Sequence, residues 1–225
     1  MRGAGEVFMR TPHPLRTQLV WVILLLCPAT GLAQELKPVQ LPKPQTDIGR
    51  PLMQVFKDRR STRTFSSEPL PGQVVSNLLW AAFGINRPES GGRTAPSASN
   101  RQEIDIYVAT VEGLYIYDAK GNRLKPVIHD DVRAQTGIQP FVKDAPVNLV
   151  YVADLARAGT DSAERDIDVA ADTGFIAQNV YLFCASEGLA TVVRGSIDRR
   201  ALSNAMRLRP NQRIILAQTI GYPQK

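Results

Sequence analysis

The chain has 225 residues, of which 44% are hydrophobic and 21% are charged, so it is long enough to bury the core of one domain. Its formal net charge is +6, but no stripe of Lys and Arg alternates with aromatic residues, which excludes nucleic acid as the expected partner. Only two His and two Cys are present, so a His-based triad or a multi-His metal site is excluded, and we expect no bound metal.

Residues 1–33 have the features of a secretory signal peptide. Three Arg precede an apolar run at 19–27, and Gly31 and Ala33 suit cleavage after Ala33. The run is too short to span a bilayer, and an uncleaved anchor is the alternative. Removing the segment takes away three Arg and one Glu, which leaves a charge of +4. We therefore expect an exported, periplasmic protein with no stable membrane span and, with Cys184 as its one remaining cysteine, no internal disulfide.

Residues 34–50 are predicted to form an extended arm. Pro38, Pro42 and Pro44 exclude a helix or a central strand there. The arm would be a tether or a segment that wraps a neighbour. A single domain is expected at 51–225.

The domain begins with helical patterns and continues with strands. A helix is expected from Pro51 to the basic stretch at 57–66, and an amphipathic helix at 70–87 is expected to end at Gly84. We expect a loop at 87–102, strands at 103–110, 145–154, 189–195 and 212–223, a hairpin at 113–128, a mixed helical stretch at 129–140 and a long helix at 166–188. The long helix is apolar nearly all round, which predicts burial on most sides. Because strands and helices do not alternate strictly, the fold class is α+β.

The stretch "KDRRSTRTFS" (57–66) concentrates cations and hydroxyl groups. Its guanidinium groups could bind a phosphate dianion through charge-assisted, bidentate hydrogen bonds. They could equally form a solvated surface paired to Asp58 and Glu68. This stretch alone leaves both interpretations open. The candidate residues are Arg59, Arg60, Ser61 and Arg63.

Two later segments offer further candidates. The small-residue loop "APSASNRQ" (95–102) can present backbone N–H groups and hydroxyls to a ligand, or it is a plain turn. The strand at 189–195 ends in Arg194, which could select an anionic substrate or pair with Asp198. Trp80 and Phe83 are expected in the core, with stacking on a ring-shaped ligand as the alternative.

Four segments in this order resemble the nitroreductase family of flavin enzymes. "RRSTRTF" looks like its phosphate turn, and "APSASNRQ" is similar to its Pro-Ser-x-x-Asn-x-Gln loop, although Glu103 and Ile104 replace the Pro and aromatic residue that usually follow. "DTGFIAQNVYLFCASEGLATVVRG" resembles its long dimer helix and next strand, and "IGYP" its closing strand. The resemblance covers 51–223, and "GLYIYD" (113–118) is similar to the branch of thiazoline- and oxazoline-forming dehydrogenases.

The resemblance implies an intertwined homodimer with a mostly antiparallel central sheet flanked by helices, and one FMN at each subunit interface. It implies an oxidoreductase that moves hydride equivalents in a two-step, ping-pong exchange between NAD(P)H or another donor and a small-molecule substrate. The flavin carries the chemistry, so no catalytic side chain is expected. The implied cofactor-binding residues are Arg59, Arg60, Ser61 and Arg63 of one subunit, Pro96, Ser97, Ala98 and Asn100 of the other, and the strand end Val193, Arg194 and Gly195. The alternative is a diverged, flavin-free member that binds a small anion or a partner protein after export.

Overall fold

The computed structural model describes residues 1, 3, 9, 35–160 and 162–224. The signal-peptide prediction therefore lies outside the described residues, apart from three isolated positions. Residues from 34 onward form a unit of their own. Among the described residues there is no helix long and apolar enough to cross a membrane.

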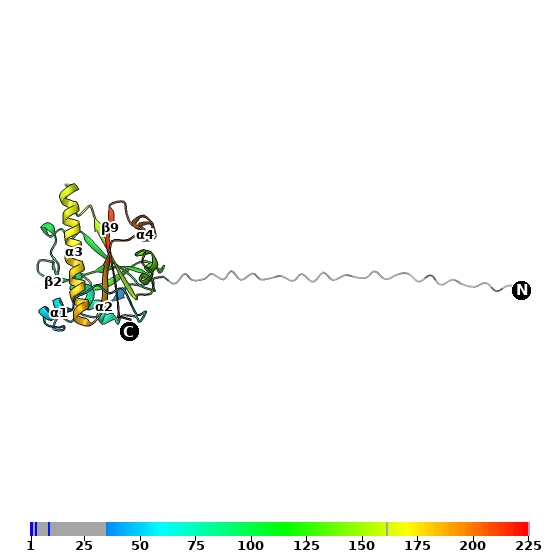
Figure 1. Ribbon diagram of the computed structural model, residues 1–225. Helices are drawn as coiled ribbons and strands as arrows, with labels where there is room; N and C mark the ends of the chain where they lie inside the picture. Colours follow the sequence, from blue (N-terminus) through cyan, green and yellow to red (C-terminus); the bar gives the residue numbers. More distant parts are fainter. Residues whose placement is uncertain (2, 4–8, 10–34, 161, 225) are drawn as a thin grey trace. The chain divides into compact units, whose positions relative to one another are not determined.

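The centre of this unit is a sheet with helices packed around it (Figure 1). The sheet has seven strands in the order β1-β6-β5-β4-β7-β9-β8. Every pairing in it is antiparallel, which confirms the predicted α+β class and the mostly antiparallel sheet. A separate antiparallel pair joins β2 (Ile85–Arg87) to β3 (Gly92–Arg93). The strands of the main sheet are β1 (Val39–Gln40), β4 (Ile104–Ala109), β5 (Leu114–Asp118), β6 (Arg123–Ile128), β7 (Val147–Asp154), β8 (Ala190–Arg194) and β9 (Gln212–Gly221).

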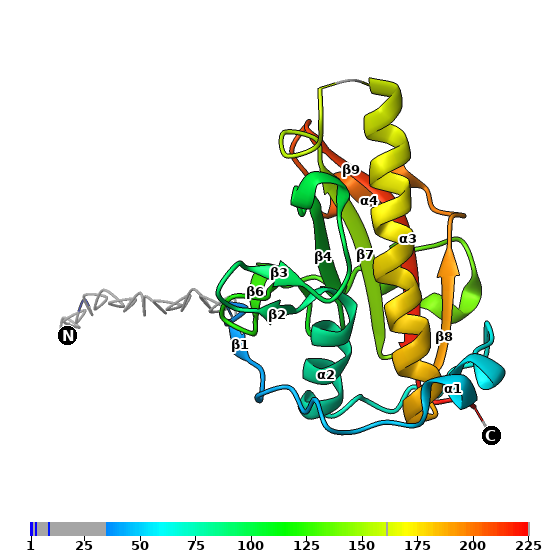
Figure 2. The same ribbon diagram turned by 90° about the vertical axis from the view of Figure 1, so that its left-hand side faces the viewer.

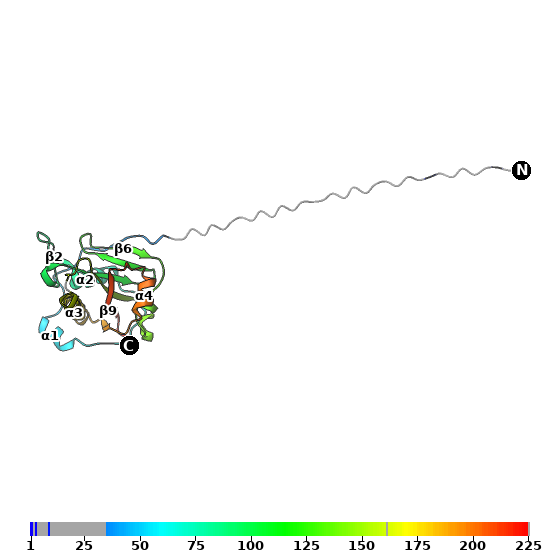
Figure 3. The same ribbon diagram turned by 90° about the horizontal axis from the view of Figure 1, so that it is seen from above.

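Helices cover both faces of the sheet. α2 (Gly72–Phe83) and α3 (Ser162–Glu187) pack on one face, and α4 (Arg199–Ala205) packs on the other (Figure 3). α1 (Leu52–Asp58) lies beside the C-terminal end of α3 (Figure 2). Three short 3₁₀ helices are η1 (Ala98–Asn100), η2 (Arg133–Gln135) and η3 (Pro140–Val142). All eight residues of β7 are buried between these layers, as the apolar run at 145–154 predicted.

Several predicted elements need correction. The stretch 129–140 is not a mixed helix, because only the short η2 and the first residue of η3, Pro140, are helical there. The loop predicted at 87–102 contains β3 and η1. α4 was missed because it has only seven residues and carries no clear apolar period. Its N-cap is Asp198, whose side chain accepts a hydrogen bond from the N–H group of Ala201.

The long helix α3 differs from its prediction in two respects. It begins at Ser162, four residues before the apolar pattern that predicted it. It is also not buried on most sides, because Ile167 is 70% exposed and Phe175 is 48% exposed in this chain. Ala170, Ala171 and Gly174 lie on the same exposed side of the helix. One face of α3 therefore packs on the sheet, while the other presents apolar and small residues to the outside.

The arm at 34–50 packs against its own domain over part of its length. Val39 pairs with Leu124 of β6, at the edge of the sheet where proline-rich chain is tolerated. Leu41 is buried in the core, and the N–H group of Gln45 donates to the Asn77 side-chain oxygen at 2.9 Å. This part of the arm is thus neither a free tether nor a segment that wraps a neighbour.

Candidate functional site

The basic stretch lies along the free edge of β8. α1 ends at Asp58, so the residues that follow are extended rather than helical. The N–H group of Thr62 donates to the backbone oxygen of Thr191 in β8 at 2.9 Å. Phe65 is buried and bridges to Pro223 after β9. These contacts at both ends hold the segment 59–65 against the sheet.

The guanidinium groups of this segment have few protein partners. Asp58, the expected partner, instead pairs with Arg50 at 2.5 Å. The Arg59 guanidinium lies 5.3 Å from the centre of the Tyr181 ring, a cation–π contact. Within the part of the chain that the structure describes, exposed Arg60 and Arg63 form no ion pair. Among the described residues, Arg59, Arg60 and Arg63 form no ion pair with Asp58 or Glu68, so the alternative of a paired surface is not observed.

Tyr181 of α3 links the basic stretch to β8, a role that was not predicted. Its hydroxyl lies 2.8 Å from the Ser61 hydroxyl and accepts a hydrogen bond from the N–H group of Val193 at 2.9 Å. The sequence analysis did not single out Tyr181 within the long helix. A polar atom on an otherwise apolar turn was the signal that could have found it.

A cavity of about 370 Å³ lies between the basic stretch, the C-terminal half of α3 and β8. Its walls carry four cationic side chains, those of Arg50, Lys57, Arg59 and Arg60, against the single carboxylate of Asp58. Such a lining favours an anionic ligand. Cys184 also lines it but is fully buried, and burial raises the pKa of its thiol, so this cysteine behaves as a small apolar residue rather than a nucleophile.

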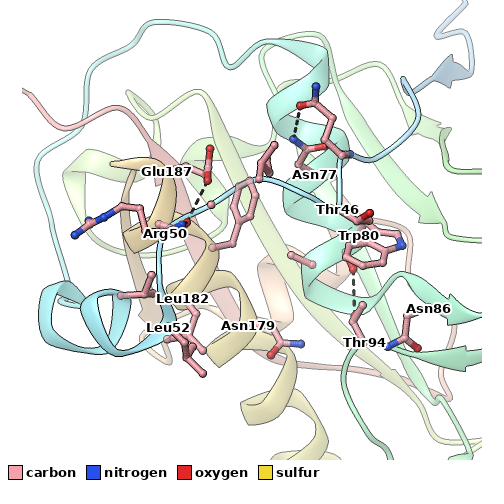
Figure 4. Close-up of a pocket in the computed structure, with 17 residues that line it drawn as sticks. Thr46, Arg50, Leu52, Asn77, Trp80, Asn86, Thr94, Asn179, Leu182 and Glu187 are labelled. Atoms are coloured by element: carbon pink, nitrogen blue, oxygen red, sulfur yellow. Dashed lines mark hydrogen bonds between the residues drawn. The ribbon is translucent and has the colours of Figure 1, made fainter.

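A second cavity, of about 410 Å³, lies between the arm, α1, α2 and α3 (Figure 4). Arg50 and Leu52 border it on one side, and Trp80 forms part of the opposite wall. The Trp80 ring N–H donates to the Ile85 backbone oxygen at 3.1 Å, so its polar atom is satisfied by the protein. Phe83 is buried in the core, as expected.

β8 is the last strand of the sheet, so alternate N–H groups of this strand point outward. The N–H group of Val193 is one of them, since it donates to Tyr181. By the same alternation the N–H group of Arg194 faces β9, and that of exposed Gly195 faces outward. Of the three predicted residues at the strand end, Gly195 is the one with a backbone donor left for a ligand.

The Arg194 side chain does not have the predicted role. It is 4% exposed, so it cannot reach a substrate, and Asp198 caps α4 instead of pairing with it. Its guanidinium donates to the side-chain oxygens of Thr219 and Asn148 and to the backbone oxygen of Thr136 at 2.6–3.0 Å. Burial lowers the pKa of Arg194 to about 10.

The loop at 96–100 lies apart from the basic stretch in this chain. The N–H group of Ala98 donates to the Asp172 carboxylate at 2.9 Å, near the middle of α3, whereas the basic stretch contacts Tyr181. Nine helical residues separate these two anchor points, which is about 14 Å along the axis. Pro96 and Asn100 are exposed, and the Ser97 hydroxyl accepts a hydrogen bond from the N–H group of Gln102. One chain thus brings together the basic stretch and the end of β8, but not this loop.

The loop is held in an unusual backbone conformation. Ser99, Asn100 and Gln102 all have positive φ angles near 50°. Arg101 pairs with Asp168, one helical turn before Asp172 on α3, at 3.0 Å. Glu103 next to the loop is buried, and burial together with the neighbouring Asp172 carboxyl raises its pKa. These contacts fasten the loop to α3.

Comparisons with known proteins agree with this arrangement. The model of the nitroreductase family matches residues 56–222. The chain is 32% identical over 156 residues to a "putative nitroreductase" of Methanocaldococcus jannaschii, which covers 64% of this chain and 78% of that protein. A crystal structure of a protein of the same description from Ralstonia eutropha is 44% identical, with a TM-score of 0.81 over 84% of this chain and 91% of that one.

A more distant structure is that of the NADPH:FMN oxidoreductase of Vibrio harveyi complexed with NAD⁺. It is 22% identical, with a TM-score of 0.59 over 77% of this chain and 69% of that one, and at this identity it shows the fold alone. The family model covers more than half of the chain, and the predicted resemblance is confirmed. The chain belongs to the nitroreductase family and is an oxidoreductase.

Proposed function

We propose that the protein is an FMN-dependent oxidoreductase that passes hydride equivalents from NAD(P)H or another donor to a small-molecule acceptor in two successive steps. The observation that carries this proposal is that Arg60 and Arg63 are exposed and form no ion pair among the described residues, on a segment that is hydrogen-bonded to the edge strand β8. Family membership and the FMN named for the Vibrio harveyi neighbour support the choice of cofactor. The motif at 113–118 supports the branch of thiazoline- and oxazoline-forming dehydrogenases, and the physiological acceptor is open.

The residues present fit FMN. Arg59, Arg60 and Ser61 would hold its phosphate and ribityl chain, because a phosphate dianion needs the cations and hydroxyl that this segment offers. Arg63 would lie at the pyrimidine edge, where a cation stabilises negative charge on the reduced ring. The outward N–H group of Gly195 would donate to the reacting ring nitrogen. When bound, FMN supplies reversible two-electron chemistry that no side chain here provides.

We infer that a second copy of the chain completes each site. Pro96, Ser97, Ala98 and Asn100 would reach the flavin of the partner subunit, since about 14 Å along α3 separates this loop from the basic stretch of its own chain. The exposed apolar residues of α1 and α3 support a homodimer, because monomers rarely expose apolar residues in such groups. They are Leu52, Met53, Phe56, Ile167 and Phe175.

The place of action is also part of the proposal. Residues 1–33 would direct export, and the domain would then acquire FMN in the periplasm.

An FMN titration of the purified chain tests the proposal. We expect saturable binding, followed by the change in flavin absorbance, and a rise of about 10- to 100-fold in Kd for Arg60→Ala and Arg63→Ala, because a hydrogen bond to a charged group contributes about 1.5–3 kcal/mol. The matched control is Arg200→Ala, an exposed arginine on α4 across the sheet, which should bind like the wild type. A well-folded dimer that binds no FMN would favour the flavin-free alternative.

A further inference from the structure

Arg194 is a buried cation with no carboxylate partner in the part of the chain that is described. All of its recorded hydrogen bonds go to neutral oxygens. Nε donates to the Thr219 hydroxyl at 3.0 Å, and Nη2 donates to the Asn148 side-chain oxygen at 3.0 Å. Nη1 donates to the backbone oxygen of Thr136 at 2.6 Å. Burying a charge without a counter-charge lowers the stability of the folded chain. If Arg194 served packing alone, an apolar residue of similar size would give a more stable fold.

The network spans three separate parts of the chain. Thr219 and Asn148 belong to the central strands β9 and β7, whereas Thr136 belongs to the irregular segment between β6 and β7. The Thr219 hydroxyl also donates to the Asn148 oxygen at 2.7 Å, which fixes the acceptors that hold the guanidinium. The strong bond to Thr136 therefore attaches the irregular segment to rigid sheet.

Gly137 lies directly against the guanidinium group of Arg194. A Cβ atom added to Gly137 would lie 1.9 Å from Nη1 of Arg194, so glycine is required for the segment to approach the guanidinium. The next residue, Ile138, donates its N–H to the backbone oxygen of Ser196 at 3.2 Å. Residues 136–138 are thus fastened to β8 at two points, on either side of Gly195.

Ile138 is 73% exposed although its backbone is held in place. It stands at the exit of β8, next to exposed Gly195 and Ser196. Single exposed apolar residues are common on protein surfaces, but this one is held at a fixed position beside Gly195. It offers an apolar contact to a molecule that binds beside Gly195.

We propose that Arg194 is a positioning residue that clamps the segment 136–138 to the end of β8, and that Ile138 thereby forms an apolar wall where the acceptor meets the reacting edge of the cofactor. This inference rests on the proposed function, because Gly195 marks the reacting edge only if FMN binds there.

Hydrogen exchange of the full chain without FMN tests the clamp. In Arg194→Met, we expect the N–H group of Ile138 to exchange at least tenfold faster than in the wild type, while the amides in the centre of β7 keep their protection. Arg194→Lys retains the charge but not the fork of donors and should restore part of the protection. If Ile138 exchanges equally fast in the wild type and in Arg194→Met, the clamp is refuted. Should Arg194→Met fail to fold, Arg194→Lys provides the comparison, because one ammonium group cannot hold Thr219, Asn148 and Thr136 at once and Ile138 should then exchange faster than in the wild type.

Steady-state kinetics with two acceptors tests the wall. Nitrobenzene takes two electrons and two protons to become nitrosobenzene and water, while two ferricyanide ions take one electron each and no proton. NADH supplies the two electrons and one proton, and solvent supplies the other. For Ile138→Ala we expect KM for nitrobenzene to rise about tenfold relative to KM for ferricyanide, with the Kd for FMN unchanged. Val111→Ala, an exposed apolar residue on the β4–β5 turn, is the matched control and should change none of these constants.

The wall, the clamp and the proposed function would each be refuted by a different result. Equal KM values for nitrobenzene in wild type and Ile138→Ala would refute the wall while leaving the flavin enzyme intact. A wild-type chain that binds no FMN would overturn the proposed function and the role of Ile138 with it. The exchange experiment would still decide about the clamp, because it needs no cofactor.

Discussion

Glu103 should make the stability of the protein fall as pH rises, opposite to the usual effect of an acidic residue. Its side chain is 1% exposed, and neither carboxyl oxygen has a donor among the described residues. Burial raises its pKa, and the nearby Asp172 carboxyl raises it further. Asp172 already accepts a hydrogen bond from the N–H group of Ala98. A protonated Glu103 can therefore donate to Asp172, whereas an ionised one places a second negative charge beside it.

The sign of the effect follows from the raised pKa. The folded chain keeps the proton of Glu103 at pH values where the unfolded chain, with an ordinary pKa of about 4.3, has released it. The stabilising contribution of Glu103 is complete below that value and is lost as pH rises through the folded-state pKa. One retained proton corresponds to a limiting slope of about −1.4 kcal/mol in the free energy of unfolding per pH unit.

Glu103→Gln isolates this slope, because glutamine has nearly the same shape and its amide can donate to Asp172 at every pH. Urea unfolding followed by circular dichroism between pH 4 and 9 gives the free energy of unfolding of both proteins. We expect the advantage of Glu103→Gln to grow with pH by up to about 1.4 kcal/mol per unit and then to level off. Glu89→Gln, on an exposed turn, controls for the loss of one negative charge. A difference between wild type and Glu103→Gln that is constant over this range would refute the reasoning.

Two further predictions concern charge and assembly. Burial opposes ionisation of Asp118, but hydrogen bonds from two cations of β6 outweigh it and lower its pKa to about 2. Asp118→Asn should therefore lower the free energy of unfolding by about 1 kcal/mol at pH 7, and this loss should fade as pH falls toward 2. Equal stability of the two proteins at pH 7 in urea unfolding would contradict this. Phe175→Glu places a charge on the exposed face of α3 and should convert a dimer into a monomer by light scattering, while Val111→Glu should not; a dimer in both variants would argue against this interface.

Elements with a strong period could be predicted from the sequence, and elements without one could not. The alternation at 103–110 and the apolar run at 145–154 became β4 and β7, because a buried strand allows few other patterns. α4 and η3 have no such pattern, since a short helix is fixed by its cap and by tertiary contacts rather than by periodicity. The exposed face of α3 misled the prediction because a helix that is apolar all round looks the same whether its own chain or another copy covers it.

The roles of the arginines in the site could be predicted from the sequence only in part. Arg59, Arg60 and Arg63 were predicted to hold the cofactor and Arg194 to select an anionic substrate, yet sequence position does not reveal which guanidinium groups are buried after folding. Arg60 and Arg63 are exposed, whereas Arg194 is enclosed by hydroxyl and amide oxygens from β7 and β9. Those acceptors lie 25 and 46 residues away from Arg194 in the chain, so only the register of the sheet brings them to it. A motif can thus identify the basic stretch, but the fate of an isolated arginine depends on long-range pairing.

The position of α3 gives the proposed dimer a physical link between its two sites. Tyr181 near one end of the helix contacts Ser61 and Val193, which belong to the site of its own chain. Asp172, near the middle, holds Ala98 in the loop that would serve the site of the partner. A helix is stiff over this distance of about 14 Å, so a displacement at one contact is transmitted to the other. Glu103 faces Asp172, which holds the loop that would serve the partner's site. Protonation of Glu103 should therefore affect FMN binding at the partner's site more than at the site of its own chain. A change in FMN affinity of Glu103→Gln with pH, in parallel with the change in stability, would be the sign of that link.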